Sequence, residues 1–67
     1  MTAITKQELL NHLGKEITVL EGGKKTVIVF EKLHAGWIQG YCQTYHSLVQ
    51  IFLDAPQDEH SPKYFLS

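Results

Sequence analysis

The sequence contains no arginine and only one cysteine, Cys42. Its basic residues are six lysines, and the formal net charge is −1. Nucleic-acid-binding proteins usually concentrate positive charge and use arginine for paired contacts to phosphate and guanine, so the composition argues against a nucleic-acid partner. A single cysteine cannot form an internal disulfide, and the N-terminus has no apolar run suited to export or membrane insertion. We therefore expect a cytoplasmic protein that does not act on a membrane.

Charge is also missing from the middle of the chain, because residues 33–53 contain no Asp, Glu, Lys or Arg. This segment and residues 26–32 hold the long apolar runs and most of the aromatic residues. A chain of 67 residues forms one domain, here 1–67, and buries only about 60% of its unfolded surface. The core of such a small domain must therefore be built from this segment.

The N-terminal segment predicts a short helix at about 5–13. Thr5 is a suitable N-cap, Glu8 completes a capping box three residues later, and Gly14 suits the C-terminal end. The apolar stripe of this helix consists of Leu9, Leu10 and Leu13. We expect the stripe to pack on a sheet, because so short a helix is not stable alone.

Alternating and β-branched residues predict strands at about 16–20 and 26–32, joined by a glycine turn. Residues 37–53 fit two interpretations, one helix or two strands at about 37–43 and 48–53. Their content of Trp, Tyr, Thr, Val and Ile, with few good helix formers, favours two strands. A last short strand is a candidate at 63–66.

We thus predict an α+β fold, in which the N-terminal helix packs on a small, bent antiparallel sheet of four to five strands. The alternative is an α-β-β-α order with a helix at 37–53. A helix followed by short strands, with a glycine turn after the first strand, resembles the Sm-like fold and other small SH3-like barrels. The segment Thr26–Cys42 lacks the glycine and the aspartate–asparagine pair of the Sm-type motif. The resemblance implies a small barrel and, as an alternative function, nucleic-acid binding.

A candidate binding face follows if 37–43 is extended. One side of that strand would then carry Trp37, Gln39, Tyr41 and Gln43. Aromatic side chains that alternate with amides are typical of adaptable binding surfaces. Tyr45 would extend this face across the following turn, and the polar loop 54–59 adds three acidic candidates: Asp54, Asp58 and Glu59. In the competing interpretation, Trp37 and Tyr41 belong to the core of a small barrel.

Histidine, a common metal ligand, is more frequent here than in most chains of this length. The four histidines, His12, His34, His46 and His60, fall in four different predicted elements. Only Cys42 and His46 have a motif-like spacing, and it brings them together only on a helix. We therefore predict no metal site, no cofactor and no catalytic residue, and we interpret Cys42 as a core residue.

The sequence is most consistent with a small non-enzymatic protein-binding module, such as a regulator, adaptor or inhibitor, whose partner is another protein. Apolar residues on both faces of 26–30 and 48–53 also predict a homodimer or higher oligomer. The first alternative is a nucleic-acid binder of Sm-like or SH3-like type, which would stack bases on Trp37, Tyr41 and Tyr45. Its phosphate contacts would come from Lys24, Lys25 and Lys32. The second alternative is a small metal-binding protein that uses some of four residues: His34, Cys42, His46 and His60.

Overall fold

The computed structural model describes residues 2–66, which form one antiparallel sheet of six strands and a single short 3-10 helix. The strands are β1 (Thr2–Ile4), β2 (Glu16–Glu21), β3 (Lys24–Leu33), β4 (Trp37–Cys42), β5 (Ser47–Phe52) and β6 (Lys63–Leu66). The 3-10 helix η1 spans Gln7–His12, between β1 and β2. In the sheet the strands follow the order β1-β6-β2-β3-β4-β5, so β1 and β5 are the two edges.

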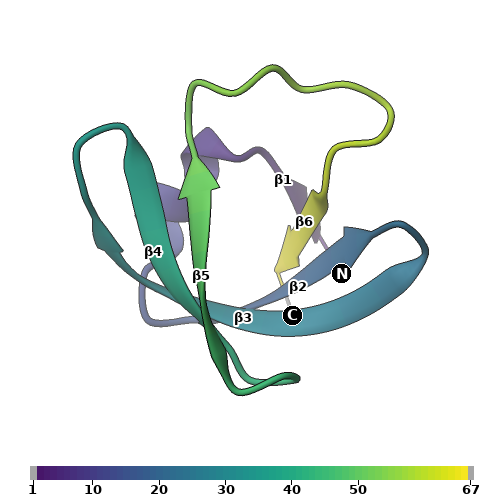
Figure 1. Cartoon of the computed structure of the whole chain (residues 1–67), viewed down its shortest axis with the longest axis horizontal. Coiled ribbons are helices and arrows are strands. Elements are labelled where there is room, and N and C mark those ends of the chain that lie inside the picture. The colour runs from purple at the N-terminus through teal and green to yellow at the C-terminus, as the bar shows by residue number, and fades with distance from the viewer. Residues whose placement is uncertain (1, 67) are drawn as a thin grey trace.

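The chain builds this sheet from three consecutive hairpins and one long return (Figure 1). Gly22 and Gly23, both with positive φ, make the tight turn between β2 and β3, as expected for paired glycines in a hairpin. The loop after β5 then carries the chain across the open side of the curved sheet, and β6 pairs with β2.

The sheet is strongly bent because β3 is long and irregular. Its pairing with β4 shifts register between Phe30 and Lys32, which is a β-bulge, and bulges bend and twist the strand that carries them. The bend wraps the sheet around its inner face, where the buried core lies. That core consists of Leu9, Ile17, Val19, Ile28, Phe30, Ile38, Cys42 and Tyr64.

The prediction of an N-terminal helix packed on a sheet is wrong. The first three described residues form β1, which pairs with β6, and only six residues of η1 follow, as a 3-10 helix. The capping box itself exists: Thr5 N–H donates to Glu8 Oε1 (2.9 Å), and Glu8 N–H donates to Thr5 Oγ1 (3.2 Å). The segment is confined between β1 and Gly14, whose N–H donates to the Phe30 carbonyl oxygen (2.8 Å). Too few residues remain for an α-helix of several turns.

The alternative with a helix at 37–53 is wrong as well, because this segment forms β4 and β5. The two-strand interpretation is confirmed, as are the strands predicted at 16–20, 26–32 and 63–66. The sheet has six strands rather than the predicted four to five, because residues 2–4, for which no strand was predicted, form β1. Within residues 2–66, no helix is long and apolar enough to cross a membrane.

Candidate functional site

The side of β4 that faces away from the core carries Trp37, Gln39 and Tyr41, all half-buried. Alternate residues of the strand point inward, and Ile38, Gly40 and Cys42 are accordingly buried. The register of β4 with β5 sets Phe52 opposite Trp37 and Leu48 opposite Tyr41. We define the outer face as this array of six residues: Trp37, Gln39, Tyr41, Leu48, Gln50 and Phe52.

Two aromatic residues of the outer face, Trp37 and Tyr41, each contact a histidine. The His34 ring stacks on Trp37 with a centroid distance of 3.9 Å and an interplanar angle of 6°. Nε2 of His34 lies 2.9 Å from Oε1 of Gln39 and donates to it, because an amide oxygen only accepts. At the other end of β4, the Tyr41 hydroxyl lies 3.4 Å from His46 Nδ1. Side chains held in this way lose little freedom when a partner binds.

Strand β5 adds an apolar, open edge to this face. Leu48 and Phe52 are 70% and 52% exposed, although both are large apolar side chains. The strand Ser47–Phe52 contains no charged residue and no proline, the two features that usually protect an edge strand from further pairing. A shallow hollow of about 290 Å³ lies beside it, lined by Trp37, Gln39, Leu48, Val49 and Gln50.

Two further predicted binding residues lie beyond the end of β4. Tyr45, in the turn after β4, is 61% exposed and lines a hollow on the inner side of the sheet together with Cys42 and Val49. Gln43 is exposed just beyond the end of β4, and its backbone N–H donates to the Val27 carbonyl oxygen (2.8 Å). The structure therefore brings Trp37, Gln39 and Tyr41 together but directs Tyr45 elsewhere.

The acidic candidates lie in the loop between β5 and β6, where all three are exposed. Asp58 Oδ1 accepts from the His60 N–H (2.8 Å) and from the Ser61 hydroxyl (3.2 Å). Glu59 lies 3.5 Å from His60 Nε2. Asp58 and Glu59 thus make local contacts that shape their own loop, while Asp54 stands at its start.

Sequence reasoning missed Leu48, Phe52 and Gln50 of the outer face, and the two histidines that contact it, His34 and His46. The first two alternate with Gln50 in a strand without charge, and that pattern marks an exposed apolar edge. The histidines gave no such signal, because their contacts depend on turn geometry. His46, for example, adopts a positive φ of 55°.

Among residues 2–66, no group of three or more His, Cys, Asp or Glu side chains is placed to hold a metal ion. Cys42 is buried in the core, whereas His60 lies in the exposed loop and His34 stacks on Trp37. The three lysines of the nucleic-acid alternative do not lie together. Lys32 lies opposite Gln39, whereas Lys24 and Lys25 lie at the other end of β3.

No protein-family model matches this chain, and neither the curated proteins nor the solved structures contain a significant match.

Proposed function

We propose that this chain is a small non-enzymatic protein-binding module that acts through the outer face and the open edge of β5. The observation that carries the proposal is the character of that edge: a six-residue strand without charge that exposes Leu48 and Phe52. An unpaired edge of this kind accepts a further strand through its free N–H and C=O groups. The buried thiol of Cys42, with no second cysteine, supports a cytoplasmic location as part of the same proposal.

The partner that fits this edge is an extended, uncharged strand with apolar residues at alternate positions. Backbone hydrogen bonds would provide the attachment, and apolar side chains would cover Leu48 and Phe52. Trp37 and Tyr41 form the next row of the same surface, and large aromatic side chains often anchor interfaces.

Strand β5 is itself such a strand, so a second copy of the chain is the partner we propose. In an antiparallel pair centred on Gln50, Leu48 of one copy lies opposite Phe52 of the other. Val49 then lies opposite Ile51, and the two Gln50 amides face each other. All pairs match apolar with apolar or amide with amide, as a two-fold symmetric interface requires.

This pairing is expected to be weak. Fully burying a Leu or Phe side chain contributes roughly 1.5–3 kcal/mol, and only the exposed parts of Leu48 and Phe52 remain to be covered. Association itself costs on the order of 4–15 kcal/mol. We therefore expect a homodimer that forms in the high micromolar range.

Sedimentation velocity over a range of protein concentrations tests the proposal. The wild type should shift from monomer to dimer as the concentration rises. Leu48→Lys should remain monomeric, because the added charges of the two copies would lie within the new interface. Leu33→Lys is the matched control, since Leu33 is also an exposed apolar residue, 47% accessible, but lies on β3; it should dimerise like the wild type. A wild type that stays monomeric at high micromolar concentration would overturn the pairing.

A further inference from the structure

Lys6 is buried without an acidic partner. It lies between β1 and η1 and is only 5% exposed. Its Nζ donates to the Ala55 carbonyl oxygen at 2.9 Å, and among residues 2–66 no salt bridge from Lys6 to an acidic side chain is found. An ammonium group has three N–H donors, and its removal from water is costly unless an anion compensates the charge. A negative group beside the Lys6 ammonium would therefore be favourable.

A second buried residue with a polar group, Tyr64, lies in the same region. Tyr64 of β6 is 3% exposed, and its ring packs edge-on against Phe30. No hydrogen bond from its hydroxyl to another residue is found in the part of the chain that is described. Burial, together with the negative charge of Glu21, raises the pKa of Tyr64 to about 12. The hydroxyl is thus protonated at neutral pH and available as a donor.

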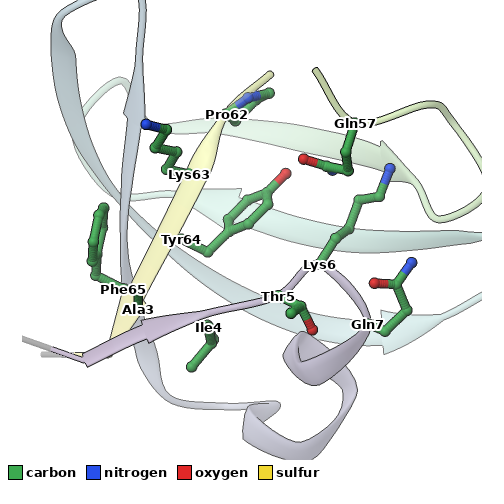
Figure 2. Close-up of a pocket in the computed structure, with 10 residues that line it drawn as sticks. All are labelled: Ala3, Ile4, Thr5, Lys6, Gln7, Gln57, Pro62, Lys63, Tyr64 and Phe65. Atoms are coloured by element: carbon green, nitrogen blue, oxygen red, sulfur yellow. The ribbon is translucent and has the colours of Figure 1, made fainter. Parts of the chain in front are cut away.

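Both groups line a pair of neighbouring hollows. One has a volume of about 280 Å³ and the other about 170 Å³, and four residues line both: Lys6, Gln57, Pro62 and Tyr64. Figure 2 shows the larger hollow, with the side chain of Lys6, just before η1, and that of Tyr64, in β6, extending toward Gln57. Much of the remaining lining is apolar and includes Ile4 and Phe65.

We propose that this hollow binds a small organic carboxylate. Its oxygens would accept hydrogen bonds from the Lys6 ammonium and the Tyr64 hydroxyl, and its apolar part would lie against Ile4 and Pro62. Lys63 also lines the larger hollow but is exposed, so Lys6 is the buried cation of its lining. One buried cation matches a monoanion better than a phosphate dianion, and the apolar lining favours an acid with a hydrocarbon body. The larger hollow contains no residue of the outer face, whereas the smaller one is also lined by Gln50 and Phe52.

Binding is tested by following backbone amide NMR signals of the full chain during titration with sodium benzoate. Saturable shifts are expected at Lys6, Gln57 and Tyr64, and the uncharged analogue benzamide should leave them unchanged. Lys6→Met should weaken binding by roughly tenfold or more, because a charge-assisted hydrogen bond is lost. Lys15→Met removes the same charge from an exposed site and should bind like the wild type.

Tyr64→Phe provides a second, independent variant if Lys6→Met fails to fold. It removes only the hydroxyl and should weaken benzoate binding several-fold. Saturable binding of acetyl-alanyl-phenylalanine in preference to benzoate would support a carboxylate at a peptide end, and the reverse would support a free acid. Absence of saturable shifts, equal binding of benzamide, or tighter binding of inorganic phosphate would each overturn the carboxylate site.

Discussion

Gly40 lies in β4 opposite Phe30, where the core has no room for a side chain. A Cβ atom at this position would lie 2.9 Å from Ile28 Cγ2, 2.9 Å from Phe30 Cδ1 and 3.1 Å from Val49 Cγ2. All three contacts are with side chains of neighbouring strands, so relief requires that several move together. Gly40→Ala should therefore lower the free energy of unfolding by roughly 1–3 kcal/mol, as overpacking does. Urea denaturation measures this change, and an unchanged midpoint would show that the core has spare room.

At this residue scale, the sequence predicts side-chain direction better than side-chain contacts. Strict alternation in 37–43 was enough to predict that Trp37, Gln39 and Tyr41 share a face, and the structure confirms that orientation. The alternation did not predict that Gly40 leaves space for the Phe30 ring, because the sequence of one strand does not reveal its register with the neighbouring strand. Trp37 and Tyr41 were predicted either to form a binding face or to belong to the core. Both lie on the outer side of the sheet and are half-buried.

Among the elements, η1 shows how a correct local signal led to a wrong prediction. The reciprocal Thr5–Glu8 hydrogen bonds exist, and hydrogen bonding to the Glu8 carboxyl, from the Thr5 backbone N–H first and from its side chain second, lowers the pKa of that carboxyl. A capping box fixes where a helical turn begins, but it does not set the length of the helix. That length was decided by distant pairing, of β1 with β6 and of Gly14 with Phe30, which no local pattern reveals.

Edge strand β5 carries a prediction about backbone exchange. Along an edge strand, alternate N–H groups point away from the sheet and exchange readily with solvent. If β5 pairs with a second copy, these amides should exchange more slowly at high protein concentration than at low concentration. Amide hydrogen exchange measured at two concentrations locates this protection, and Leu48→Lys should abolish it. The opposite edge, β1, serves as the internal reference, and equal exchange of β5 at both concentrations would contradict pairing through this strand.

For the whole molecule, stability rests on a bent sheet whose inner face is closed by residues from both ends of the chain. Leu9 comes from η1 and Tyr64 from β6, and both belong to the same buried core as Phe30. Local patterns predicted the central strands because each is a short alternating run. The sheet order was not predicted, because the return of β6 to β2 depends on the long loop that follows β5.

Because Tyr64 belongs to that core, its titration should be visible in the stability of the entire protein. Its folded-state pKa is raised from 10.0 to about 12 by burial and by Glu21. Below pH 10 the tyrosine is protonated in both states, so its contribution is fully present there. Between pH 10 and 12 the unfolded state loses the proton first, and roughly 1–2 kcal/mol of stability is lost after allowance for screening by solvent in the neighbouring hollows.

Lysines also lose their charge in this range, so the informative quantity is the difference between the wild type and Tyr64→Phe. Urea unfolding from about pH 9 to about pH 12 should show the wild type losing stability more steeply. Phenylalanine keeps the ring against Phe30 and removes only the ionisable group, so the variant separates packing from titration. Parallel pH profiles would mean that the Tyr64 hydroxyl is solvated in the folded state, and they would also remove the support that its raised pKa gives to the carboxylate site.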